Sequence, residues 1–89
     1  MTERELEKQL KALANRRRLL ILTYLKGHRE AAVGDISDAI NLSFKATSKH
    51  LGVLAAADIV DKEQRSLQMW YRLSQSIHHV SKYISNSLE

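Results

Sequence analysis

The 89-residue chain contains no cysteine and no proline, and it has only three glycines. The absence of cysteine excludes disulfides, thiolate metal sites and thiol redox switches. The shortage of proline and glycine leaves few chain breakers, which favours helices. No apolar run reaches the roughly 18 residues that a bilayer span requires, and the first residues are charged rather than signal-like. We therefore expect a cytoplasmic protein with no membrane partner.

The composition is that of one folded domain, or of one subunit of a larger assembly. Hydrophobic residues make up 44% of the chain, which is too many for a disordered segment. A chain of this length can bury a modest core, but not an enclosed active site between two lobes. The sequence also shows no Ser/His/Asp set, no phosphate loop and no paired carboxylates on one face. We expect a single domain over residues 1–89 that is not an enzyme and needs no cofactor.

Positive charge is concentrated in one part of the chain. The formal net charge is +4, and residues 15–30 alone hold five bases against the single acid Glu30. Clustered base in a small domain is typical of nucleic-acid binding. Ordinary solubility charge is the simpler interpretation, and composition alone does not decide between the two.

The first half of the chain predicts four helices. Thr2 and Glu5 form a capping box at the start of a helix over about residues 2–14. Asn15 is a second cap, followed by a helix that is apolar nearly all round and ends at Gly27. Residues 28–34 are expected to be a loop, and Asp35 is expected to start a short third helix that stops at Asn41.

A fourth helix begins at Ser43, and together with the third it predicts a helix-turn-helix over about residues 35–57. At 100° per residue, its predicted core side holds Phe44, Thr47, Leu51, Leu54 and Ala55. Its other side holds Lys45, Ser48, Lys49 and Gly52. The helix is therefore expected to have one apolar and one basic face.

The period changes from 3.6 to 2 after Asp58. Residues 59–73 alternate around a polar turn, which predicts a two-stranded hairpin with Arg65 at its tip. Ser74 is then expected to cap a last helix over about residues 74–88. The fold class is mainly α with a small β-hairpin, in the order α-α-α-α-β-β-α.

These residues resemble the ArsR-type winged helix-turn-helix repressors over about residues 10–73. Leu10–Leu22 is similar to the family's entry into its second helix, and Ile36–Leu42 to its positioning helix. The most specific stretch, Leu42–Leu54, resembles the serine-initiated recognition helix with its histidine-leucine and valine-leucine pairs. Ala57–Val60 and Trp70–Leu73 match the start and end of the wing.

The chain departs from the family pattern at four positions. Arg16 stands where a proline is usual, Asn41 and Asp58 stand where glycine is common, and Gly52 replaces a basic residue. The positioning helix also lacks the cysteines of the metal-sensing members. The resemblance therefore implies the branch of the family that has no metal sensor.

The resemblance implies a regulator, most simply a repressor, whose partner is double-stranded DNA. In that context Lys45, Ser48 and Lys49 are candidates for base edges, Ala46 for a thymine methyl, and Ser43 for a phosphate. His50 lies between the core and DNA faces and is assigned to helix packing or a phosphate contact. Further candidates for the DNA backbone are Arg65 on the wing and Arg16 and Arg17 at the edge of the site. The alternative for the Arg16–Arg18 cluster is that one arginine, with Arg18 as the candidate, makes an internal ion pair.

The family also implies a homodimer built from the first and last helices, and two apolar stripes agree with it. A chain of this size can bury one such stripe against its own core, but not readily both. The simpler interpretation is that both helices only cover the core. The predicted dimer residues are Leu6, Leu10, Leu13, Ile77, Val80, Ile84 and Leu88.

Two other functions remain open at this stage. A winged helix can serve as a protein-interaction module, and acidic Asp35 and Asp38 beside the recognition helix favour that alternative. The second is a metal-responsive repressor. His78 and His79 are adjacent and are expected to point about 100° apart on a helix, so no set of three ligands is expected to converge on a metal.

Overall fold

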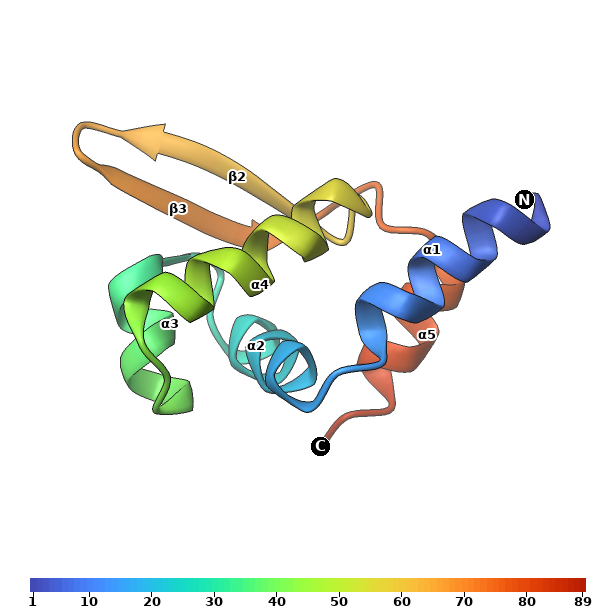
Figure 1. The fold of residues 1–89 in the computed structure, drawn as a ribbon, viewed down its shortest axis with the longest axis horizontal. Helices are drawn as coiled ribbons and strands as arrows, with labels where there is room; N and C mark the ends of the chain where they lie inside the picture. Colours follow the sequence, from blue (N-terminus) through green and yellow to red (C-terminus); the bar gives the residue numbers. More distant parts are fainter.

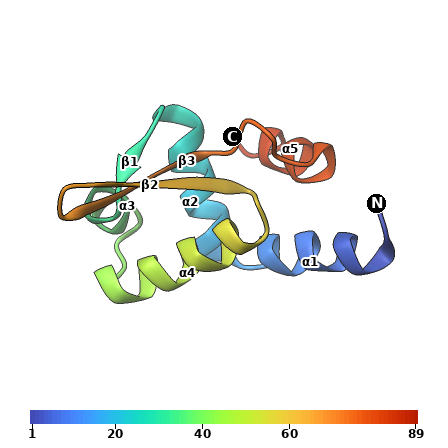
Figure 2. The ribbon, with the colours of Figure 1, turned by 90° about the horizontal axis from the view of Figure 1, so that it is seen from above.

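The computed structural model describes all 89 residues as five helices and three short strands (Figure 1). Helices α2, α3 and α4 pack together, and the hairpin extends beyond α3. Helices α1 and α5 lie at the opposite end of the molecule (Figures 1 and 2). In chain order the elements are α1 (Glu3–Leu13), α2 (Arg16–Gly27), β1 (Ala31–Ala32), α3 (Val33–Ile40), α4 (Phe44–Ala56), β2 (Val60–Arg65), β3 (Gln68–Leu73) and α5 (His79–Asn86).

Three helix starts predicted from polar caps are confirmed. The side chains of Thr2, Asn15 and Ser43 accept hydrogen bonds from main-chain amides three residues ahead, at 3.1–3.2 Å. Helix α2 ends at Gly27, as expected. Asn41 adopts a left-handed conformation with φ 55°, which turns the chain between α3 and α4.

A strand that the sequence did not predict lies within residues 28–34, the region assigned to a loop. Ala31 and Ala32 pair with Tyr71 and Trp70, so the sheet has the antiparallel order β1-β3-β2. The predicted hairpin forms the other pair, from Val60↔Leu73 to Arg65↔Gln68. The sheet holds Ala32 extended, and α3 starts directly after it at Val33 rather than at Asp35.

The last helix is shorter than the sequence predicted. It begins at His79 and not after Ser74, whose buried hydroxyl accepts a hydrogen bond from the amide of Ser76 and closes a local turn instead. The cap of α5 is His78, whose Nδ1 accepts from the amide of Val80 at 3.2 Å. Ile77 therefore lies in the connection before the helix.

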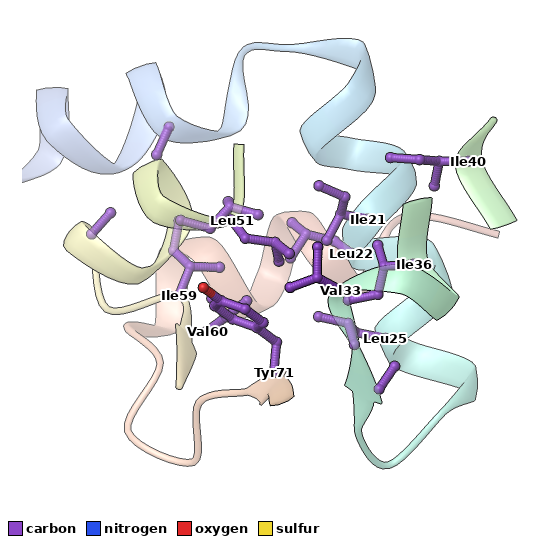
Figure 3. Close-up of a cluster of buried hydrophobic side chains, with 14 of the residues drawn as sticks. Ile21, Leu22, Leu25, Val33, Ile36, Ile40, Leu51, Ile59, Val60 and Tyr71 are labelled. Carbon is purple, nitrogen blue, oxygen red and sulfur yellow. The ribbon is translucent and has the colours of Figure 1, made fainter. Parts of the chain in front are cut away.

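The core is built around α2, which is covered on most sides, as its apolar sequence predicted (Figure 3). Ile21 and Leu22 of α2, Ile36 of α3, Leu51 and Leu54 of α4, and Ile59 are fully buried. Phe44 departs from the prediction. The periodicity of α4 placed it on the core side, but its side chain is 62% exposed, whereas Thr47 in the same turn is fully buried.

Polar side chains connect the two terminal helices to the rest of the fold. The Gln9 amide of α1 donates to the carbonyl of Ala57 at 2.6 Å and accepts from the hydroxyl of Ser81 in α5. Lys26 at the end of α2 donates to the carbonyls of Ser85 and Leu88 at 2.9 and 2.6 Å. Because a cation is favourable at the carbonyl end of a helix, Lys26 stabilises the end of α5.

Candidate nucleic-acid interface

The outer face of α4 carries unpaired positive charge. Lys45 and Lys49 are exposed, neither forms a salt bridge, and α4 contains no acidic residue. Ser48 lies near them and is half-buried. The hydroxyl oxygen of Ser43 accepts from the amide of Ala46, so its hydrogen remains free to donate from the helix start. This end of α4, with its free amides and positive dipole end, favours an anion.

Ala46 and His50 lie on the side of α4 that turns toward the protein. Both are half-buried. Burial lowers the pKa of His50, and the nearby positive charges of Arg18, Arg17 and Lys49 lower it further. Nδ1 of His50 lies 3.3 Å from Nη1 of Arg18. A neutral imidazole accepting from the guanidinium fits both observations, and it gives His50 a contact between helices.

The three consecutive arginines at the start of α2 have three different environments. Arg16 is exposed and has no hydrogen-bonded partner in the protein. Arg17 donates to the carbonyl of Ile40 at 3.3 Å, at the end of α3. Arg18 donates to the carbonyls of Ala12 and Lys11 at 2.5 and 3.0 Å, at the end of α1.

The internal ion pair expected of Arg18 is therefore wrong. Its partners are main-chain carbonyls and His50 rather than a carboxylate. The last carbonyls of α1 lack helical partners and carry partial negative charge, which makes them good acceptors for a guanidinium. Arg17 donates in the same way to a carbonyl at the end of α3. Arg16 is the arginine of the cluster that is exposed to solvent without a partner in the protein.

Arg65 near the tip of the wing is engaged by two carboxylates. It forms salt bridges with Glu30, in the segment before β1, and with Glu63 on its own strand at 3.1 Å. Its guanidinium also lies 5.1 Å from the centre of the Trp70 ring. Hydrogen bonds from Arg65 are the main cause that lowers the pKa of both Glu30 and Glu63. Arg72 joins the network through Glu63 at 3.2 Å, so the four charges cancel.

The predicted dimer residues divide between exposed and buried positions. Leu10 is 44% exposed and Leu6 half-buried, on an open surface of α1 whose other lining residues include Glu3, Arg4, Glu7 and Lys11. Leu13 is 4% exposed and belongs to the core of the subunit. Ile77, Ile84 and Leu88 pack on that core but remain partly exposed, as does Val80. Every residue of the two stripes except Leu13 therefore keeps some exposed apolar surface in the single chain.

The two adjacent histidines do not point apart as predicted. Because His78 precedes the helix and His79 begins it, their ring centres lie only 4.2 Å apart. No group of three or more His, Asp or Glu side chains is placed to hold a metal ion. None of the helices is long and apolar enough to cross a membrane.

Sequence reasoning missed two residues at this face of the molecule. Phe44 was assigned to the core because helical spacing does not show how far the core extends along α4. Glu30 was counted only as charge in a basic segment, and its partner Arg65 is 35 positions away. The strand β1 brings Glu30 and Arg65 together, and its two residues Ala31-Ala32 are too few for a sequence pattern to signal a strand.

Comparison with known proteins identifies relatives with this arrangement. Residues 15–62, which include α2, α3, α4 and the start of the wing, match the family model described as "Bacterial regulatory protein, arsR family". The transcriptional activator HlyU of Vibrio cholerae is 40% identical over 65 residues. That stretch covers 73% of this chain and 59% of the length of HlyU, so it spans less than two thirds of that relative.

Solved structures share the fold over nearly the whole chain. Reduced HlyU from V. cholerae superposes with a TM-score of 0.81 at 32% identity, covering 97% of this chain and 86% of the other. The transcriptional repressor BigR from Xylella fastidiosa gives 0.77 at 28%, over 97% and 81%. The homodimeric winged helix-turn-helix DNA-binding domain of Mb0332 from Mycobacterium bovis gives 0.79 at 26%, over 94% and 74%.

Proposed function

The chain belongs to the ArsR family of bacterial regulatory proteins, and we propose that it is a homodimer that regulates transcription by binding double-stranded DNA. The observation that carries the proposal is the unpaired positive face of α4. Lys45 and Lys49 project from the second helix of a helix-turn-helix and have no carboxylate partner in the protein. In this fold that helix enters the major groove with its N-terminal residues toward the bases.

The roles of the individual residues follow from their positions on α4. Lys45 and Lys49 are suited to the acceptors of guanine, and Ser48 to either a donor or an acceptor on a base edge. Ser43 donates its free hydroxyl hydrogen to a phosphate at the helix start. Arg16 is the arginine of the cluster best placed for a phosphate, because Arg17 and Arg18 already bind carbonyls.

Dimerisation is supported by apolar surface at the end of the molecule away from the wing tip. The outer side of α1 presents Leu6 and Leu10, and α5 adds the exposed parts of Val80 and Ile84. The related Mb0332 domain is homodimeric. A twofold dimer that placed its two α4 helices about 34 Å apart would match successive major grooves and a palindromic operator.

The direction of regulation depends on where the operator lies. Among the relatives, HlyU is named an activator and BigR a repressor. A dimer that occupies an operator overlapping a promoter blocks polymerase, which represses transcription. Because a bacterial regulator meets its DNA in the cytoplasm, the protein would act there.

Selection of bound duplexes from a random pool tests the proposal. The parent protein is expected to enrich a palindrome with half-sites about one helical turn apart. Lys49→Ala should relax the preference at one position of each half-site, while Lys82→Ala, which changes an exposed lysine on α5, should select the same sequence as the parent.

Two results would contradict the proposal. One is a pool that shows no enrichment over successive rounds. The other is capture of the same protein partners from extract with and without nuclease, which would favour a protein-interaction module instead.

A further inference from the structure

Phe44 is a large apolar side chain without a covering partner, placed at the first position of α4. Its exposed fraction is 62%, and it does not belong to the core cluster. It follows the cap residue Ser43 directly and precedes Lys45, which is also exposed. The ring therefore stands at the end of α4 that carries the free amides.

The proposed dimer does not cover this ring. The N-terminal end of α4 lies beside α3, at the end of the helix away from α1 and α5 (Figure 1). A partner subunit bound through α1 and α5 therefore leaves Phe44 exposed. No other element of the chain buries it.

Phe44 is the largest exposed apolar side chain of α4, 62% exposed against 38% for Val53. At about 100° per residue, Phe44 lies about 40° from Ser48, 100° from Lys45 and 140° from Lys49, so it stands at the edge of the lysine-bearing face, in the first turn of the helix. Ala46 was the sequence-based candidate for a thymine methyl. Ala46 is half-buried, whereas the side chain of Phe44 is exposed. An apolar contact from the N-terminal turn of α4 is therefore better made by Phe44.

We propose that Phe44 determines part of the sequence preference by packing its ring against the C5-methyl group of a thymine in the major groove. This inference rests on the proposed DNA-binding function and names a determinant within it. The C5-methyl group is the apolar feature that the major groove displays, and phenylalanine is among the side chains that contact it. A 5-methylcytosine carries the same group, but thymine is the base that supplies it in ordinary duplex DNA.

The test removes the methyl group and the ring separately. A duplex enriched by the parent protein is resynthesised with each thymine in turn replaced by deoxyuridine, symmetrically in both half-sites. Affinities are then measured by fluorescence anisotropy. At one position the parent should lose roughly fourfold per half-site, or about 15-fold in total, because burial of one methyl group contributes about 0.8 kcal/mol. Phe44→Ala should bind the thymine and uracil duplexes equally.

Control variants separate this effect from general loss of binding. Phe44→Leu keeps an apolar group and should retain part of the discrimination between thymine and uracil. Val53→Ala removes another exposed apolar side chain of α4, 38% exposed, nearer the opposite end of the helix, and should discriminate as the parent does. The melting temperature of Phe44→Ala should match that of the parent, since the ring is outside the core.

The outcomes distinguish this inference from the proposed function. Enrichment of a palindrome together with unchanged uracil discrimination in Phe44→Ala overturns the role of Phe44 but leaves DNA binding intact. The role of Phe44 is also overturned if the parent protein binds every uracil-substituted duplex as tightly as the thymine duplex. Failure of the parent to enrich any duplex overturns the proposed function, and this inference with it.

Discussion

Nη1 of Arg18 lies 3.3 Å from Nδ1 of His50, so the start of α2 contacts the middle of α4 through this side-chain pair. The same guanidinium donates to the last carbonyls of α1 at Ala12 and Lys11. Arg18 thereby joins the helix proposed to read DNA to a helix proposed to form the dimer. Arg18 therefore contributes to the relative position of α1 and α4, together with the Gln9–Ala57 hydrogen bond.

Replacing Arg18 should destabilise the fold without removing any core side chain. Arg18→Ala leaves two helix-end carbonyls of α1 without a protein donor and removes a cation from the negative end of the helix. We expect a loss of about 1–2 kcal/mol in the free energy of unfolding, measured by urea denaturation. Arg16→Ala is the matched control and should change stability by less than about 0.5 kcal/mol. Equal effects of the two variants would contradict the structural role of Arg18.

His50 should make the protein less stable as the pH falls. Its pKa is lowered in the folded state, first by burial and then by the charges of Arg18, Arg17 and Lys49. The unfolded chain, with an ordinary histidine pKa of about 6.5, therefore binds more protons than the folded protein below neutral pH. The stability that His50 contributes is present above pH 6.5, and it is lost as the pH falls from there toward the pKa of His50 in the folded protein.

Urea denaturation at several pH values between 7.5 and 5.5 checks this. In His50→Gln, the free energy of unfolding should fall less steeply over this range than in the parent. His79→Gln, at an exposed histidine of α5, serves as the control and should follow the parent. A His50→Gln variant with the parent's slope would show that His50 is not the group responsible.

The elements predicted well are those whose signals are local. The caps Thr2, Asn15 and Ser43, the stop at Gly27 and the alternating hairpin each depend on residues a few positions apart, and all are present in the structure. Ser74 shows where a local signal fails. A serine can close a short turn as well as cap a helix, and here its hydroxyl does the former.

The features that were missed depend on residues distant in sequence. The Arg65–Glu30 pair exists because β1 adds to β3, and two alanines are too short a strand to recognise by pattern. Phe44 has the helical spacing of the core residues, but that spacing does not show whether another element packs against its side chain. The candidate site was therefore predictable as a face of α4, whereas the pairing of Arg65 with Glu30 was not.

The pairing of Arg65 with Glu30 predicts that removing a carboxylate strengthens DNA binding. Glu30→Gln frees the Arg65 guanidinium from one of its two partners and removes a negative charge beside the wing. We expect affinity to rise roughly two- to fivefold, since solvent screens an exposed ion pair and the released guanidinium can bind a phosphate. Fluorescence anisotropy on the selected duplex measures it.

The control for this prediction is the same substitution in an Arg65→Ala background. Without the guanidinium, Glu30→Gln should give a smaller gain than it does in the parent. An equal gain in both backgrounds would mean that Glu30 acts only through its own charge, and that Arg65 does not reach DNA when it is released.

The salt dependence of binding tests the central claim most directly. If each subunit makes three or four phosphate contacts, a dimer should show a log–log slope of affinity against salt concentration of about −5 to −7. The measurement is an anisotropy titration of the parent protein on one duplex over a series of salt concentrations. A slope in that range supports a DNA-binding dimer that uses the positive face of α4, and a slope near zero would contradict it.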